Sequence, residues 1–297
     1  MKLTCLVDNA VLQYTPFWGE HGLSVLVDTP EGRMLFDTGA SGTVLLHNME
    51  AAEVDPESIQ ALALSHGHRD HTGGLAAFLE RCPGLPIYAH PDVLRERFSR
   101  RDAEMRAVGM PVYRSPEPPQ EGGMRAIGMT IPPEDLRRRA DLRLSPEPQE
   151  ILPGVWTTGE VTHRTEPEGR SPYHFVRGEA GWAMDPYRDD MSLILETSRG
   201  LALLCGCCHA GLLNTLAHVE RVFGRPVVAV FGGTHLISAD ADHLERVRQR
   251  LQELPLRRVS PSHCTGETAF HFLLQALGPK MVRPFPAGAQ VDLEALE

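Results

Sequence analysis

Short apolar runs alternate with amphipathic segments along most of the chain. The apolar runs are rich in Leu, Val and Ile and are bounded by Gly, Pro and Asp, a pattern typical of β-strands. The segments between them repeat apolar residues at helical spacing, which predicts helices. In the first third, the predicted strands are 3–7, 23–27, 34–36, 61–65 and 86–89, and the predicted helices are 43–52, 74–81 and one that starts at Pro91. This order indicates a small sheet followed by β/α alternation.

A second series of strands and helices begins at Met191. Its predicted strands are 192–196, 201–204, 227–231 and 257–259, and its predicted helices are 212–223, 240–254 and 267–277. The two halves show no repeat in sequence. Elements in this order can form two sheets with helices outside them, each sheet coming largely from one half. We therefore predict an α/β protein with a four-layer αβ/βα sandwich, folded as a single domain over residues 1–297.

The segment 111–153 breaks the alternation because it is rich in proline. Proline lacks a backbone N–H and fixes φ, so a high density of it resists regular structure. The prolines inside this segment are Pro116, Pro118, Pro119, Pro132, Pro133, Pro146 and Pro148. We predict an irregular insertion here. Two roles stay open for it, a surface excursion without a catalytic part or a lid that shapes the substrate pocket.

The densest cluster of metal-binding side chains directly follows the predicted strand 61–65. It contains His66, His68, Asp70 and His71. Imidazole and carboxylate groups hold Zn²⁺, Fe or Mn at neutral pH. Residues two apart in an extended segment point to the same side, so His66 and His68 can share one ion. Asp70 and His71 face elsewhere and can serve a second ion, or act as one ligand and one base, as two-metal hydrolases require.

Three later predicted strands end at donor side chains of related kinds. The carboxyl ends of strands in an α/β sheet gather at one edge, so donors that follow different strands can converge there. In chain order, these donors are Cys207, His209, His235 and His263. We expect them to approach the cluster at 66–71.

We expect different roles for these four donors. His209 is predicted to complete a three-histidine set with the first two histidines of the cluster, and His263 is predicted to hold a metal as well. Cys207 is either a thiolate ligand or one of the small buried thiols common at strand ends. His235 is either a ligand, a group that supports a ligand, or a substrate contact.

Composition limits which partners and which cellular compartment we expect. The chain has 39 acidic and 29 basic residues, a formal net charge of −10, which argues against a nucleic acid or an anionic membrane as the main partner. A small-molecule substrate fits better. The six cysteines are scattered in a chain too long to need disulfides, which indicates free thiols in a reducing compartment. With neither a signal-peptide pattern nor a membrane-length apolar run, we expect a cytoplasmic protein, and its oligomeric state stays open.

The pattern H-x-H-x-D-H at 66–71, followed by single histidines at later strand ends, resembles the metallo-β-lactamase superfamily over nearly the whole chain. The Asp-Thr-Gly triplet at 37–39 also looks like an early element of that superfamily. The resemblance implies an αβ/βα sandwich with one or two metal ions, usually Zn²⁺ and sometimes Fe or Mn, at one edge of the paired sheets. Many members carry a Gly-Asp pair whose carboxylate bridges two metals, whereas this chain has Gly206-Cys207. Either Cys207 substitutes and favours a softer ion such as Zn²⁺, or the site holds one metal under some conditions.

Four segments look more narrowly like a subgroup described as metal-dependent hydrolases of the superfamily's second class. They are 6–9, 20–24, 206–209 and 261–266. Some relatives in that subgroup are described as synthases that act on a dihydropterin and a ribofuranosyl-aminobenzene phosphate. Asn9 and His21, within the first two segments, are candidate substrate contacts.

Together these features predict a metal-dependent hydrolase. A metal-activated water would attack an ester, lactone, thioester or phosphoester of a small metabolite, and Asp70 would also orient or deprotonate that water. The predicted ligand sets are His66, His68 and His209 for the first ion, and Asp70, His71 and His263 for the second.

Two alternatives stay open. One is a synthase or transferase in which the metals bind a phosphorylated aromatic substrate and no water attacks. Its candidate phosphate contacts are Arg95, Arg97, Arg100, Arg101 and the arginines at 137–139, although the same clusters fit solvated helix faces better. The other alternative is a non-catalytic protein that binds a metal or a ligand.

Overall fold

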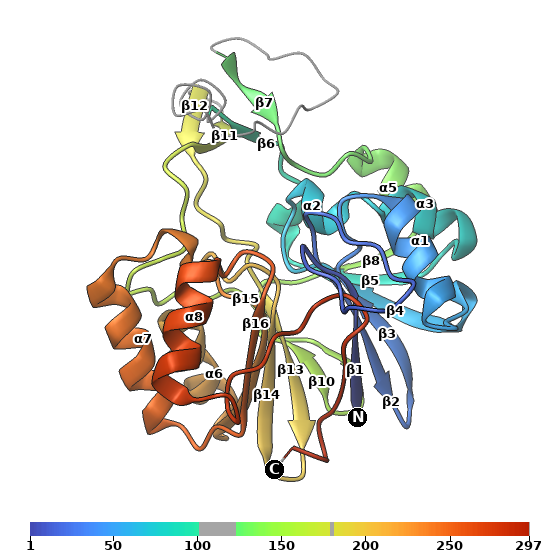
Figure 1. Cartoon of the computed structure of the whole chain (residues 1–297). Coiled ribbons are helices and arrows are strands. Elements are labelled where there is room, and N and C mark those ends of the chain that lie inside the picture. The colour runs from blue at the N-terminus through green and yellow to red at the C-terminus, as the bar shows by residue number, and fades with distance from the viewer. Residues whose placement is uncertain (101–122, 179–180, 297) are drawn as a thin grey trace.

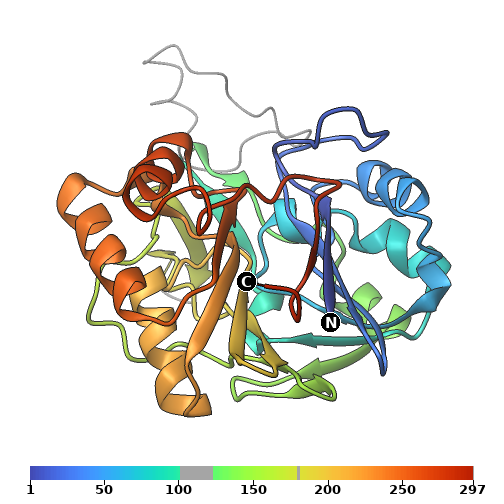
Figure 2. The same ribbon diagram turned by 60° about the horizontal axis from the view of Figure 1, so that its bottom comes forward.

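Two mixed β-sheets face each other in the middle of the protein, and helices cover the outer face of each (Figure 1). This arrangement comes from a computed structural model, which describes residues 1–100, 123–178 and 181–296. Figure 2 shows the two helical layers on opposite flanks of the sheets. The predicted four-layer αβ/βα sandwich is confirmed.

The first sheet is built mainly by the N-terminal half and has the strand order β17-β1-β2-β3-β4-β5-β8. Its strands are β1 (Lys2–Val7), β2 (Ser24–Thr29), β3 (Gly32–Phe36), β4 (Ile59–Ala63), β5 (Pro86–Ala89), β8 (Asp141–Leu144) and β17 (Gln290–Asp292). The first three strands are antiparallel, whereas β3, β4, β5 and β8 run parallel. Helices α1 (Gly42–Ala51), α3 (Leu75–Arg81) and α5 (Pro133–Arg139) lie on this side of the sandwich (Figure 1).

The second sheet comes mainly from the C-terminal half and has the order β16-β15-β14-β13-β10-β9. Its strands are β9 (Glu150–Leu152), β10 (Val155–Thr157), β13 (Ser192–Thr197), β14 (Gly200–Cys205), β15 (Val227–Gly233) and β16 (Arg258–Ser262). Strands β14, β15 and β16 are parallel, so their carboxyl ends lie at one edge. The outer helices are α6 (Leu212–Phe223), α7 (Ala241–Glu253) and α8 (Glu267–Leu277).

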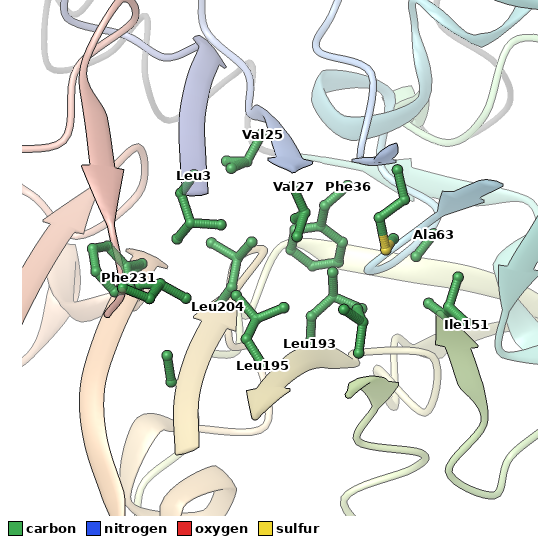
Figure 3. Packing of buried hydrophobic residues seen from close by; sticks show 14 of the residues in the cluster. Leu3, Val25, Val27, Phe36, Ala63, Ile151, Leu193, Leu195, Leu204 and Phe231 are labelled. Carbon is green, nitrogen blue, oxygen red and sulfur yellow. The ribbon is translucent and has the colours of Figure 1, made fainter. Parts of the chain in front are cut away.

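The central core fills the space between the sheets. Figure 3 shows Leu3, Val27 and Phe36 of the first sheet opposite Leu193 and Leu204 of the second. There are two further apolar clusters, one between each sheet and the helices that cover it. Because both faces of the sheets are covered, strands such as β14 are buried at every position and read in the sequence as continuous apolar runs. This rigid frame fixes the loops at the sheet edge.

A third, four-stranded sheet projects from the sandwich (Figure 1). It pairs β12 (Gly181–Met184), β11 (His174–Gly178), β6 (Arg97–Ser99) and β7 (Arg125–Ala126). The prediction of a helix that starts at Pro91 is wrong. Only a 3₁₀ turn forms at Pro91–Leu94, and the chain then extends into β6.

The expected irregular insertion at 111–153 needs correction where the structure describes it. Residues 111–122 lie outside the described residues, but 123–153 contain α5 and strands of all three sheets. Pro133 occupies the first turn of α5, where a missing N–H costs nothing. Among the helices of the described residues, none is long and apolar enough to cross a membrane.

Candidate metal centre

Three imidazoles from both halves of the chain meet at the edge of the sandwich. His66 and His68 follow β4, and His68 immediately precedes the short helix α2 (Arg69–Thr72). His209 follows β14 in the facing sheet. One ring nitrogen of each lies within 4.8 Å of the other two, and all three side chains are buried. The structure therefore brings the first predicted ligand set together.

Two nitrogens of this group are buried without a hydrogen-bond partner, His68 Nε2 and His209 Nε2. A buried polar atom left unpaired costs about 1–3 kcal/mol, so the orphaned Nε2 of His209 indicates a ligand. His68 faces His66 with its other ring nitrogen, Nδ1. His209 Nδ1 is bonded to the Gly169 carbonyl oxygen at 2.8 Å, which leaves Nε2 free for that ligand. His66 Nε2 and His68 Nδ1 are 3.0 Å apart, close to the ~3.3 Å that separates two nitrogens bound to one tetrahedral zinc at ~2.0–2.1 Å. The residues fit a divalent cation.

The same three rings are held neutral. Burial is the main cause, and repulsion from neighbouring imidazoles adds to it, so the pKa of His66, His68 and His209 lies well below the ordinary value of 6.5. Neutral imidazole is the form that binds metals. The set therefore needs to lose no proton at pH 7 before it binds a cation.

A second group of donors lies beside the first. His71 Nε2 is 3.1 Å from His263 Nε2 and 3.2 Å from Cys207 Sγ. Asp70 Oδ2 is 3.3 Å from His263 Nε2. Cys207 also belongs to one cluster with His66 and to another with His209, so its sulfur lies between the two groups. The structure thus brings together the second predicted ligand set, Asp70, His71 and His263, and places the sulfur of Cys207 beside it.

Asp37, at the end of β3, orients His71. Its Oδ2 lies 2.7 Å from His71 Nδ1, while its two carboxylate oxygens accept bonds from Ser65 N at 2.7 Å and Ser65 Oγ at 2.6 Å. Burial opposes a charge on His71, but the carboxylates of Asp37 and Asp70 outweigh burial and raise the pKa of His71 to about 9. A carboxylate on the remote nitrogen is a common support for a metal-binding imidazole, because it fixes which nitrogen faces the ion.

Asp8 and Asn9, just beyond β1, support His263. Asp8 Oδ1 accepts a bond from the His263 backbone N–H at 2.8 Å. Asn9 Nδ2 donates to the His263 carbonyl oxygen at 3.1 Å, and Asn9 Oδ1 lies 3.1 Å from His263 Nδ1. With its amide engaged in this way, Asn9 supports the centre, which argues against the predicted substrate contact. His21 is the exposed member of the group: its side chain is 66% exposed, and its Nε2 lies 3.4 Å from Asp70 Oδ2.

His235 and Cys264 complete the C-terminal side. The ring of His235 lies 4.4 Å from that of His209, centroid to centroid, and its Nδ1 is buried without a partner. Cys264 Sγ donates to the Cys207 carbonyl oxygen at 3.5 Å. Burial disfavours a thiolate at Cys264, but contacts with Cys207 and His235 outweigh it and hold the pKa of Cys264 well below its usual value.

The sequence analysis missed some of the surrounding side chains. The ring of Tyr187 stacks on His209 at 4.2 Å, and its hydroxyl is 2.8 Å from Nδ1 of His174, whose ring lies 5.1 Å from His68. Both come from stretches without clear periodicity, so the sequence carries no signal for Tyr187 and only a weak one for His174.

The arginines proposed as phosphate contacts behave differently from one another. Arg97 is buried and paired with Asp185 and Asp189, so it is neither a phosphate contact nor part of a solvated helix. Asp189 Oδ2 in turn accepts a bond from Gly67 N at 2.8 Å, between the first two histidines. Arg101 lies outside the described residues. Within α5, Arg138 pairs with Asp135 at the surface.

Comparison with known proteins agrees with this geometry. The family model for the metallo-beta-lactamase superfamily matches residues 18–174, more than half of the chain. A 7,8-dihydropterin-6-methyl-4-(beta-D-ribofuranosyl)-aminobenzene-5'-phosphate synthase of Methanocaldococcus jannaschii is 28% identical over 284 residues, covering 93% of this chain and 91% of the relative.

Solved structures show the same fold over the full length. The crystal structure of a metal-dependent hydrolase of the beta-lactamase superfamily has a TM-score of 0.80 and 26% identity, with 99% of each chain covered. Zn²⁺-bound PqqB from Methylobacterium extorquens has a TM-score of 0.58 and 12% identity, and the match covers 99% of this chain and 100% of that one. At that identity the second likeness concerns the fold alone.

Proposed function

Since the chain belongs to the metallo-beta-lactamase superfamily, we propose that it is a metal-dependent hydrolase of a small metabolite, with one or two zinc ions as its cofactor. One observation carries the proposal. His209 Nε2 is buried without a partner of its own, in one cluster with His66 and His68 from the other half of the chain, whose Nε2 and Nδ1 lie 3.0 Å apart. A divalent ion held there would lower the pKa of a water and polarise the acceptor oxygen of the substrate.

The protein's own residues divide this work. His66, His68 and His209 would hold the first ion, and Asp70, His71 and His263 the second, with Cys207 between them. Burial opposes a charge on Asp70, yet the imidazoles of His71 and His263 outweigh it and keep the pKa of Asp70 well below its usual value. A carboxylate that lies beside the ion position can accept a hydrogen bond from a water held there, so we assign Asp70 the orienting role.

The surroundings favour a small substrate. His21 lies next to Asp70 and is the exposed member of its cluster with Asp70 and His263, so a molecule in solution can reach its side chain. The net charge of −10 disfavours a polyanion such as nucleic acid. Esters, lactones, thioesters and phosphoesters of small metabolites, phosphorylated or not, are the candidate substrates.

Reconstituted protein tests the proposal. The metal-free chain is loaded with Zn²⁺, Mn²⁺ or Fe²⁺ and offered a phosphodiester, a lactone and a thioester, with His68→Ala and the surface variant His271→Ala as a matched pair. We expect turnover of at least one substrate by the wild type and by His271→Ala, and loss of both metal and turnover in His68→Ala. Retained metal and rate in His68→Ala would contradict the assignment.

A second candidate, a synthase, is favoured by the relative from Methanocaldococcus jannaschii, because the similarity extends over 93% of this chain. A synthase should leave all three test substrates intact. It should instead join a dihydropterin that carries a leaving group on its 6-methyl carbon to a ribofuranosyl-aminobenzene phosphate, with release of that leaving group. Mass spectrometry detects the joined product. Bound metal with neither activity would favour the third alternative, a non-catalytic binding protein.

A further inference from the structure

A second thiol, Cys264, lies against Cys207 at the edge of the proposed centre. Cys207 follows β14 and Cys264 follows β16, so the two come from strands that β15 separates. Their sulfurs and one ring nitrogen of His263 all lie within 4.8 Å of one another, and all three residues are buried. Side chains from non-adjacent strands reach each other here only because the strand between them leaves room.

Glycine at the end of β15 provides that room. A Cβ atom at Gly233 would lie 2.7 Å from Cys264 Sγ and 2.3 Å from the Gly206 carbonyl oxygen. Both distances are shorter than van der Waals contact allows, so the sulfur occupies the space that a side chain at position 233 would fill. At the same edge of the sheet, Cys264 Sγ donates to the Cys207 carbonyl oxygen at 3.5 Å.

The backbone at this edge is also unusual. Cys208, His235 and His263 have φ values of +60°, +46° and +51°, in the left-handed region that non-glycine residues seldom adopt. Each follows one of the three parallel strands β14, β15 and β16. Such conformations cost about 1–3 kcal/mol each and persist where the surrounding structure enforces them, commonly at ligand sites. His235 and His263 are donors at this edge, whereas Cys208 lies in the chain between the donors Cys207 and His209, and its own sulfur contacts Thr215 Oγ1 at 3.3 Å.

From this geometry we propose that Cys264 is a metal ligand, and that with Cys207 and His263 it gives the second ion position a two-thiolate, one-imidazole face selective for soft divalent ions. The inference rests on the proposed metal centre and goes beyond it, since it assigns a new ligand and an ion class. Thiolate and imidazole ligands favour Zn²⁺, Co²⁺ and Cd²⁺ over Mn²⁺ or Mg²⁺, which prefer oxygen. On binding, each thiol loses its proton to the buffer, so the sulfur–hydrogen bond breaks as the sulfur–metal bond forms.

Cobalt substitution of the full chain gives the test a readout other than activity. The metal-free wild type, Cys264→Ser and Cys82→Ser are each titrated with Co²⁺, and the thiolate-to-cobalt charge-transfer absorption is recorded. Cys82 is the matched control because it is also a buried thiol, but it donates to the Pro56 carbonyl oxygen at 3.1 Å, away from the centre. Calorimetric titrations with Zn²⁺, Cd²⁺ and Mn²⁺ on the same proteins measure affinity and ion preference.

We expect the wild type and Cys82→Ser to give the same charge-transfer intensity, and Cys264→Ser to lose roughly half of it because one of two thiolates is gone. The affinity of the second ion position for Cd²⁺ should fall by about tenfold or more in Cys264→Ser, since mutation of a group that only supports a ligand already lowers metal affinity about 10–100-fold. Circular dichroism identifies a variant that fails to fold, and Cys264→Ala then replaces it. Unchanged intensity and affinity in Cys264→Ser would overturn the inference alone, whereas absence of any metal binding by the wild type would overturn the proposed function too.

Discussion

Arg97 holds two buried carboxylates beside the metal-binding loop, and its replacement by methionine should destabilise the protein strongly. Its Nε donates to Asp185 Oδ2 at 2.9 Å and its Nη2 to Asp189 Oδ1 at 2.6 Å, and all three side chains are at most 1% exposed. Arg97→Met leaves both carboxylates buried without a counter-charge. Breaking a buried pair in this way costs about 3–5 kcal/mol, and two carboxylates place this case at the upper end.

Urea unfolding of the metal-free protein measures the effect. We expect the urea concentration at the midpoint of unfolding to be lower for Arg97→Met than for the wild type. The decrease should equal about 3–5 kcal/mol divided by the slope of the unfolding free energy against urea concentration, and that slope should not change. The control is Arg138→Met, because Arg138 forms a similarly short 2.6 Å pair with Asp135 but is 72% exposed, and it should change the free energy of unfolding by less than about 1 kcal/mol. If both variants lose equally little, the structural role assigned to Arg97 is refuted.

The pH dependence of this loss has a definite sign. Burial raises the pKa of Asp189 even in the wild type, although Arg97 opposes the shift. Without Arg97, the pKa of Asp189 in the folded state should rise further above that of the unfolded chain. A raised folded pKa means that stability is retained below the unfolded value and lost as the pH rises through the folded one. The deficit of Arg97→Met should therefore shrink between pH 7 and pH 4, and a deficit that grows towards pH 4 would contradict this reasoning.

Two further substitutions test individual contacts of the centre. Asp37→Asn removes the carboxylate that holds His71 Nδ1 at 2.7 Å, so calorimetry should show a 10–100-fold weaker second zinc, and unchanged affinity would argue against a supporting role. Gly233→Ala places a Cβ 2.3 Å from the Gly206 carbonyl oxygen, so thermal unfolding should show a loss of about 1–3 kcal/mol from overpacking. A Gly233→Ala variant as stable as the wild type would show that the β15 end has more room than the distances allow.

The parts of the site that the sequence predicted are those encoded locally. The H-x-H-x-D-H pattern at 66–71 packs its donors into one turn, and His209 follows the continuous apolar run of β14. His263 follows the more polar strand β16 (Arg258–Ser262), whose place beside β15 carries it to the same edge. Convergence of these donors follows from parallel strands sharing an edge. By contrast, Cys264 had no such signal, because its contact with Cys207 depends on a glycine in a strand between them.

The two errors in the fold have different causes, one local and one long-range. Proline density at 111–153 predicts an irregular segment, yet prolines next to a helix start, as at Pro133, favour α5 rather than prevent it. The helix expected from Pro91 stops after one turn because the chain is drawn into β6, where it pairs with β11, about 75 residues further along. Strand pairing over such separations overrides local preference and leaves no periodic signal in the sequence.

The central claim is that imidazoles from two remote parts of the chain hold one cation. Crystals of the zinc-loaded protein, measured on both sides of the zinc absorption edge, test it most directly. The account predicts an anomalous peak ~2.0–2.1 Å from a ring nitrogen of each of His66, His68 and His209. Zinc density elsewhere on the protein, with these three rings free of metal, would contradict it.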